Sequence, residues 1–185
     1  PGATVWGDLS LGGARAFVER VLAEYEVECV FHLAAQVQVS VASQDPIGTL
    51  NANVWGTIAV LEACRRQKIR RIVCASSDKV YSDGPAPYFE NQPVQAGGIY
   101  ATSKAMADLA AQSYLREYGL PVAIARCGNL YGPGQLNFSA IVPDAIRCAL
   151  LGRTLVLRSD GKSRRDYLFV RDAVSGYLAL ADSDE

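Results

Sequence analysis

Tyr100 and Lys104, in the segment 98–104, are two side chains that could exchange a proton with a substrate. They lie four positions apart, so on a helix they share one face. A lysine ammonium beside a phenol favours the phenolate, and Tyr100 could then act as an acid or a base near neutral pH. The spacing alone is a weak signal, because an ordinary amphipathic surface pair has it too.

A second set of reactive side chains lies upstream, at Ser77, Asp78 and Lys79. These residues follow the segment 69–75, which has the composition of a buried strand. A hydroxyl, a carboxylate and an amine at the end of a strand can orient a substrate and move protons. The alternative interpretation is a solvated Asp-Lys pair in a loop.

The elements that must position these residues alternate between short apolar strands and longer helices. This alternation predicts a doubly wound α/β fold, a parallel sheet covered by helices. We expect strands at 29–33, 69–75, 122–126 and 154–158, a segment 166–170 before the last helix, and helices at 13–25, 46–67, 100–118, 141–151 and 171–180. In open parallel sheets, ligands bind beyond the carboxyl ends of the strands. Gln36, Ser77 and Asn129 all follow predicted strands, which indicates one active site there.

The bulk composition excludes several classes of partner. The chain has 185 residues and a formal net charge of −1, so we expect neither nucleic acid nor a membrane as partner. No apolar run is long enough to span a bilayer. Five scattered cysteines, without a Cys-x-x-Cys pair or a Cys/His cluster, predict reduced thiols, no metal site and a cytoplasmic protein.

Seven motifs in order make the chain resemble the extended short-chain dehydrogenase/reductase family, in its nucleotide-sugar epimerase and dehydratase branch. The motifs are 7–9, 31–36, 53–57, 76–81, the Tyr100/Lys104 pair, 126–133 and 165–170. The resemblance implies a Rossmann-like fold, NAD as cofactor (with NADP as the alternative) and a nucleotide-diphosphate sugar as substrate.

One family feature has no match, the first strand and glycine-rich turn that hold the cofactor pyrophosphate. We therefore expect an N-terminally truncated chain that lacks both. Residues 1–135 would form an incomplete NAD-binding domain. Residues 136–185 would begin a small C-terminal substrate lobe, interleaved with the last sheet elements.

The resemblance also implies roles for single residues. Ser77 would hydrogen-bond a sugar hydroxyl, Tyr100 would take its proton, and Lys104 would keep Tyr100 acidic while binding the nicotinamide ribose. The implied cofactor contacts are Asp8, Leu9, Leu33, Ala34, Ala35, Gln36, Asn53, Tyr100, Lys104 and Cys127. Asp8 could equally be a turn residue. Besides Ser77, the implied substrate contacts are Asn129 and Arg165. His32, the only histidine, is expected to be a hydrogen-bonded core residue.

Asp78 and Lys79 indicate the subtype, because the Asp-Lys pair resembles that of CDP-glucose 4,6-dehydratase-like members. A ketone at C4 makes the C5 proton acidic, so a base must remove that proton while an acid protonates the departing C6 hydroxyl. We expect Lys79 as the base and Asp78 as the acid of an NAD-dependent nucleotide-sugar 4,6-dehydratase, or of a fragment of one.

Two alternatives stay open at this point. The first is a nucleotide-sugar C4 epimerase of the same family, in which Asp78 and Lys79 are idle. The second is a non-catalytic binding or assembly module that uses the fold. The resemblance further implies a homodimer, because family members pair the helices at 51–67 and 100–118 in a four-helix bundle.

Overall fold

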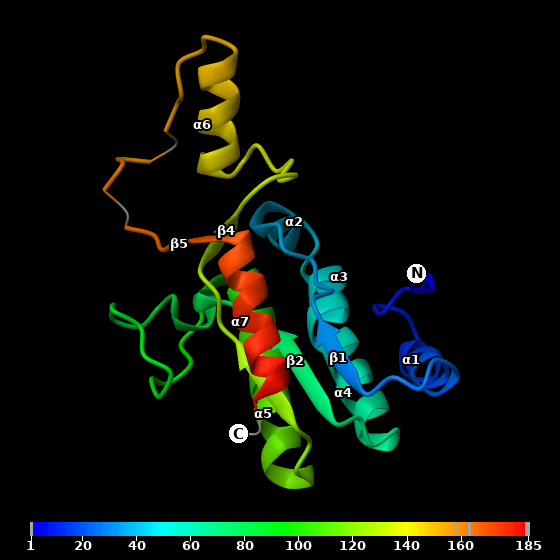
Figure 1. Ribbon diagram of the computed structural model, residues 1–185. Coiled ribbons are helices and arrows are strands. Elements are labelled where there is room, and N and C mark those ends of the chain that lie inside the picture. The colour runs from blue at the N-terminus through cyan, green and yellow to red at the C-terminus, as the bar shows by residue number, and fades with distance from the viewer. Residues whose placement is uncertain (1, 158, 163, 184–185) are drawn as a thin grey trace. The chain divides into compact units, whose positions relative to one another are not determined.

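A computed structural model of the chain describes residues 2–157, 159–162 and 164–183 (Figure 1). The chain divides into two compact units. The first comprises residues 1–126 with 179–185, and the second comprises residues 127–178. Each unit contains its own parallel sheet, which confirms the predicted α/β class.

The sheet of the first unit has three parallel strands in the order β1-β2-β3. Their bounds are β1 Cys29–His32, β2 Arg71–Ala75 and β3 Val122–Ala125. In this register Cys29 lies opposite Arg71, and Ile72 lies opposite Val122. All three strands were predicted, each within two residues of its observed ends. Their carboxyl ends therefore meet at one edge of the sheet, as the sequence indicated.

Three long helices of the first unit share one core with this sheet. They are α1 Ala14–Glu24, α4 Gly56–Arg66 and α5 Gly98–Tyr118. Leu61 and Cys64 of α4 pack with Ile72 and Cys74 of β2, and Ala111 of α5 closes the cluster. Ile72 and Cys74 are two positions apart, so they point to the same face of the sheet. This packing fixes α5, which carries Tyr100 and Lys104, against β2.

The helix predicted at 46–67 is interrupted. It consists of α3 Pro46–Leu50, the π-helix η1 Asn51–Trp55 and α4. Its start was predicted correctly, since the Asp45 side chain accepts a hydrogen bond from the Gly48 N–H at 2.9 Å and Pro46 follows as the first helical residue. The π-helix was not predicted.

Two further short helices were also missed, α2 Val39–Gln44 and the 3-10 helix η2 Asp78–Tyr81. The end of α5 was predicted correctly. There Gly119 takes the left-handed conformation at φ 61°, and its N–H donates to the Leu115 carbonyl.

The second unit has a two-stranded parallel sheet, β4 Asn129–Tyr131 with β5 Tyr167–Phe169. Helix α6 Ile141–Leu150 belongs to it, and α7 Val170–Asp182 begins in it. No strand was predicted at 129–131, and β4 forms there because this short segment pairs with β5. The strand expected at 154–158 is wrong over 154–157, and residue 158 lies outside the described residues.

Among the residues that the structure describes, none of the helices combines the length and apolarity needed to cross a bilayer. The units divide between Arg126 and Cys127. The functional roles expected for residues 1–135 and 136–185 stay predictions.

Candidate active site

The carboxyl end of β2 brings Ser77 to Tyr100. Ser77 is extended, with φ −158° and ψ 151°, and its hydroxyl accepts a hydrogen bond from the Lys79 N–H at 3.3 Å, which starts η2. Tyr100 lies in the first turn of α5, where the Ser77 hydroxyl is close enough to act on the pKa of its phenol. Two residues that are far apart in the sequence thus meet in one place, as predicted.

Lys104 is buried one turn further along α5, and its ammonium donates to the Ala75 carbonyl at 2.7 Å. We expected Lys104 to lower the pKa of Tyr100, and this is not what the structure shows. Burial raises the pKa of Tyr100, the hydrogen bond from Ser77 opposes that rise, and the Asp78 charge adds to it. Burial likewise lowers the pKa of Lys104, against the charges of Cys74 and Asp108. The reason is that desolvation of both groups outweighs their neighbours.

Asp78 and Lys79 form an ion pair with each other. The Lys79 ammonium donates to both carboxylate oxygens, at 2.9 and 2.8 Å, and the Ser77 hydroxyl lies 3.2 Å from one of them. Their side chains are 32% and 20% exposed for Lys79 and Asp78, respectively. An acid, an amine and a hydroxyl therefore lie in one hydrogen-bonded set that solvent, or a ligand, can reach.

Asn53 lies near the predicted cofactor segment but uses its amide within the protein. Its Nδ2 donates to the Gln36 carbonyl and to the Ser103 hydroxyl, both at 2.9 Å, and its Oδ1 accepts from the Gln36 N–H at 2.7 Å. The residue is only 2% exposed. Both amide hydrogens are engaged, so Asn53 fixes the segment after β1 to α5 instead of offering a donor to a ligand.

Gln36 is likewise directed inward. Its Nε2 donates to the Thr49 hydroxyl at 3.0 Å and to the Gln38 carbonyl at 3.1 Å. Leu33 and Ala34, by contrast, are exposed directly after β1, with Leu33 at 58%. Ala35 is half-buried beside them. Because β1 and β2 are neighbours, this small apolar surface lies at the same sheet edge as the buried Lys104, and it suits a flat ring system.

Asp8 and Leu9 precede α1. The exposed Asp8 carboxylate accepts from the Ser10 N–H at 2.8 Å and from the Ser10 hydroxyl at 2.7 Å, and these bonds lower the pKa of Asp8. Asp8 thus makes the turn that was weighed as its alternative role, with its carboxylate still open to solvent. Leu9 is half-buried and packs against the core next to Gly56.

His32 is the core histidine that we expected. Its Nε2 lies 2.9 Å from the Thr57 hydroxyl, which itself donates to the Asn53 carbonyl at 2.6 Å. The hydroxyl has one hydrogen, so Nε2 must be the protonated nitrogen. Burial, with the charge of Lys104, lowers the pKa of His32 to about 4. His32 is therefore neutral at physiological pH.

The remaining predicted contacts lie in the second unit. Asn129 begins β4, and its side chain donates to the Asp166 carbonyl at 3.2 Å. Arg165 is exposed and donates to the Arg164 carbonyl at 2.7 Å, and the Cys127 thiol lies 4.0 Å from the Tyr177 hydroxyl. Each is engaged within its own unit.

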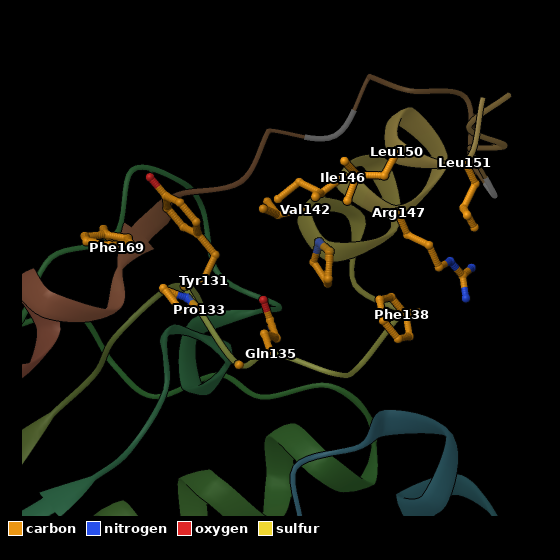
Figure 2. A pocket seen from close by; sticks show the side chains of 13 residues that line it. Tyr131, Pro133, Gln135, Phe138, Val142, Ile146, Arg147, Leu150, Leu151 and Phe169 are labelled. Atoms are coloured by element: carbon orange, nitrogen blue, oxygen red, sulfur yellow. The ribbon is translucent and has the colours of Figure 1, made fainter. Parts of the chain in front are cut away.

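An apolar pocket of about 600 Å³ lies in the second unit, between the segment 131–138, α6 and Phe169 (Figure 2). Its one charged lining residue is Arg147, whose guanidinium lies 4.5 Å from the centre of the Phe138 ring. Neither Asn129, Arg165 nor Cys127 lines this pocket among the described residues. Apart from the predicted helix at 141–151, no motif in the sequence indicated this pocket.

Sequence reasoning also missed three polar residues next to the site, Ser76, Asp108 and Arg126; Ser76 and Arg126 both donate hydrogen bonds to the Asp108 carboxylate. The available signal was Asp108 itself. It lies four residues after Lys104 on an alanine-rich face of α5, where a charged residue requires a partner.

Comparison with known proteins identifies the family. The model of the NAD dependent epimerase/dehydratase family matches residues 6–185. The chain belongs to this family. Its relatives include the UDP-glucose 4-epimerase of Mycolicibacterium smegmatis, 36% identical over 85% of this chain and 52% of the relative. The dTDP-glucose 4,6-dehydratase of the same organism is 37% identical over 80% of this chain and 45% of the relative.

Solved structures agree with this assignment. A double mutant of the dTDP-glucose 4,6-dehydratase DesIV from Streptomyces venezuelae, with NAD bound, has a TM-score of 0.83 and 33% identity, over 95% of this chain and 53% of that one. The Thermus thermophilus UDP-glucose 4-epimerase in complex with NAD has a TM-score of 0.84 and 30% identity, over 97% and 60%. The chain spans about half the length of the curated relatives it matches. Dehydratases and epimerases match it about equally well.

Proposed function

We propose that the full-length protein is an NAD-dependent nucleotide-sugar 4,6-dehydratase. The observation that carries this proposal is the hydrogen-bonded set of Ser77, Asp78 and Lys79 at the end of β2, beside Tyr100. The dehydratases among the relatives support the reaction class. The first unit would bind the cofactor, and the second would bind part of the substrate.

The exposed Leu33 and Ala34 would contact a bound dinucleotide, and Lys104 and Tyr100 would hold its ribose. The cofactor, when bound, would supply the hydride acceptor and donor for the reaction. Ser77 would hydrogen-bond the C4 hydroxyl, and Tyr100 would take its proton. Since burial raises the pKa of Tyr100, ionisation requires a nearby cation, which Lys104 would supply by turning from the Ala75 carbonyl.

Asp78 and Lys79 would carry out the elimination. A C4 ketone acidifies the C5 proton, which Lys79 would remove while Asp78 donates a proton to the departing C6 hydroxyl. These steps need a neutral amine and a protonated carboxyl.

A C4 epimerase is the second candidate, and the same ion pair favours it. Asp78 and Lys79 could bond only to each other and take no part in the reaction. The reaction would then be an oxidation and reduction at C4 alone, carried out by Ser77, Tyr100 and Lys104. The epimerase of Mycolicibacterium smegmatis supports this reading at 36% identity.

A homodimer through α4 and α5 is part of the proposal. Apolar side chains that are 45–63% exposed lie on α5 and on η1, at Met106, Leu109, Leu115 and Trp55. Their burial in a four-helix bundle would remove this apolar surface from water. Sedimentation equilibrium of the wild-type protein and of Leu109→Lys checks it, the variant being expected to dissociate. A monomeric wild type would contradict the dimer without touching the chemistry.

The test of the reaction uses the full-length protein with NAD and dTDP-glucose, UDP-glucose or CDP-glucose, followed by mass spectrometry for loss of water and by NMR for the configuration at C4. A dehydratase yields a product lighter by one water. We expect Lys79→Gln to slow this loss about a hundredfold or more, whereas the matched control Lys68→Gln, at the end of α4, leaves it unchanged. Inversion at C4 without loss of water would favour the epimerase. No conversion of any of the three nucleotide sugars would contradict both enzymes and favour a binding module.

A further inference from the structure

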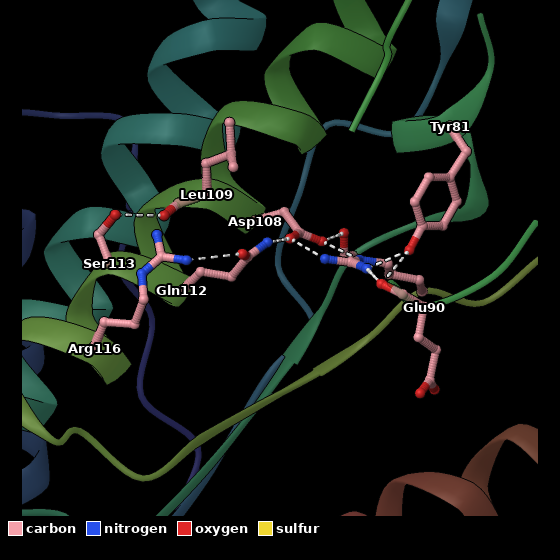
Figure 3. A network of polar contacts seen from close by, with 9 residues as sticks. Tyr81, Glu90, Asp108, Leu109, Gln112, Ser113 and Arg116 are labelled. Carbon is pink, nitrogen blue, oxygen red and sulfur yellow. Dashed lines mark hydrogen bonds and ion pairs between the residues drawn. The ribbon is translucent and has the colours of Figure 1, made fainter. Parts of the chain in front are cut away.

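The carboxylate of Asp108 is the centre of a buried polar network in the first unit (Figure 3). Oδ1 accepts from Arg126 at 2.8 Å and from the Gln112 amide at 2.7 Å. Oδ2 accepts from Arg126 at 2.9 Å and from the Ser76 hydroxyl at 2.6 Å. The side chain is 0% exposed. All four acceptor positions of the carboxylate are therefore filled by protein donors.

The network lies directly behind the candidate active site. Tyr100, Lys104 and Asp108 follow one another at intervals of four residues on α5, so they form one stripe along the helix. Ser76, which binds Asp108, immediately precedes Ser77, and its N–H donates to the Ala125 carbonyl at 2.9 Å. The ends of β2 and β3 are thus both joined to α5 through a single carboxylate.

Arg126 extends the network to the other side of the Ser77 loop. Its guanidinium donates to the Tyr81 hydroxyl and to the Glu90 carbonyl, the latter at 3.1 Å. It also lies 5.2 Å from the centre of the Tyr81 ring. Tyr81 ends η2, which carries Asp78 and Lys79. The loop is therefore anchored before Ser77 by Asp108 and after Lys79 by Arg126.

We infer that Asp108 and Arg126 are a positioning pair, which holds the segment 76–81 in the geometry that presents Ser77, Asp78 and Lys79, and which touches no substrate itself. Three facts carry this inference: bidentate pairing on a fully buried carboxylate, one bond to each flank of the loop, and complete saturation of that carboxylate. A pair that served stability alone would not need to contact both flanks. The inference rests on the proposed function only in calling the loop reactive.

Asp108 has a second effect, on Lys104. The groups that act electrostatically on Lys104, or on which it acts, are His32 of β1, Cys74 of β2 and Asp108 of α5. The Asp108 charge raises the pKa of Lys104 and so opposes the effect of burial. Loss of that charge should therefore lower the pKa of Lys104, a result that a loosened loop alone would not produce.

The test compares the wild-type chain with Asp108→Asn, Arg126→Lys and Glu24→Gln. Asp108→Asn keeps the shape of the side chain but removes its charge. Arg126→Lys keeps the charge but loses the two parallel hydrogen bonds that a guanidinium makes to a carboxylate. Glu24→Gln makes the same acid-to-amide change in the surface pair with Arg20. Hydrogen exchange is followed by mass spectrometry over 76–82. The ammonium of Lys104, one of four lysines, is titrated by NMR, with Lys104→Met for assignment.

We expect Asp108→Asn to speed amide exchange in 76–82 by roughly tenfold to a hundredfold, with little change in peptides from α1. It should also lower the pKa of Lys104. Arg126→Lys should loosen the same loop by a smaller factor without that titration change, and Glu24→Gln should alter neither readout. Should Asp108→Asn fail to fold, Arg126→Lys decides the question through the loop.

Unchanged exchange in 76–82, or an equal rise over the whole chain, would overturn the positioning role. Neither readout needs turnover. Failure of the proposed function would appear as a wild-type protein that converts no sugar, whereas failure of the positioning role would appear as an unaltered loop in the variants.

Discussion

Ser76 and Ser77 are adjacent in the chain, yet they belong to two opposite kinds of polar region. Ser76 donates to Asp108 in a buried network whose carboxylate has no free acceptor. Ser77 lies among Asp78, Lys79 and Tyr100, where the charged side chains are 20–32% exposed. One strand end therefore carries both a structural network and a set of accessible reactive groups. Saturated groups fix the geometry, and accessible groups beside them remain available for chemistry.

The largest expected effect is on stability, from removal of the buried acid. Asp108→Ala removes the fully buried carboxylate and leaves the half-buried Arg126 guanidinium without it, and breaking a buried ion pair in this way typically costs about 3–5 kcal/mol. Urea unfolding of the chain measures this loss of unfolding free energy. A loss of unfolding free energy below about 1 kcal/mol would show that the Asp108 network does not stabilise the fold.

His32 is a buried polar side chain outside the Asp108 network, and it tests how much stability a single buried neutral group contributes. Its pKa in the folded chain is about 4, below the ordinary value of 6.5, so the unfolded chain binds the proton first as the pH falls. The contribution of His32 is therefore complete above about pH 6.5 and is lost as the pH falls through 4, by about 3 kcal/mol in all. The unfolding free energy of the wild type minus that of His32→Gln, measured from pH 7 to pH 4, should fall by that amount. A difference that is constant with pH would contradict the burial of a neutral imidazole.

Ser77→Ala should show the reverse pattern from Asp108→Ala. We expect turnover of the full-length protein to fall about a hundredfold, because the substrate hydroxyl and Tyr100 both lose a hydrogen-bond partner. The unfolding free energy should change by only about 1 kcal/mol. Steady-state kinetics and urea unfolding of one preparation check both parts. A large loss of stability with normal turnover would reverse the assignment of the two regions.

The smallest effect sharpens the contrast between buried and exposed charge. Arg20 and Glu24 pair at 2.8 Å on α1, with side chains that are 60% and 49% exposed. Glu24→Gln should change the unfolding free energy by less than about 0.5 kcal/mol. Urea unfolding beside Asp108→Ala makes the comparison, and equal losses would mean that burial does not separate the two pairs.

The sequence predicted those parts of the fold that local patterns determine. The three strands of the first sheet, the Asp45 cap and the end of α5 at Gly119 follow from apolar runs and from single residues with known preferences. The place of Gln36 and Ser77 at one sheet edge followed from the parallel topology, whereas the link between Ser77 and Tyr100 came from the family resemblance. These features need no knowledge of specific distant contacts.

Features that depend on distant partners were missed or wrong. β4 exists because Asn129 pairs with Tyr167, and Arg126 contacts Asp108 across 18 positions and Tyr81 across 45. The pKa of Tyr100 was wrong in direction, because its burial outweighs a lysine that bonds elsewhere. Asn53 was expected at the cofactor, but spacing could not reveal that its amide is consumed by Gln36 and Ser103.

The π-helix η1 adds one residue to the helical segment 46–66. A π turn contains one residue more than an α turn, and each residue of an α-helix turns the chain by about 100°. A π turn spreads over five residues nearly the rotation that four α residues make, about 400°, so deleting one residue from Asn51–Trp55 would restore a regular helix and leave the phase of α4 relative to α3 nearly unchanged. Leu61 and Cys64 would then stay in the core, and the change would fall on the turn that carries Asn53 and its bonds to Gln36. The extra residue therefore serves the side chain that holds the segment after β1, and the helix that builds the core does not depend on it.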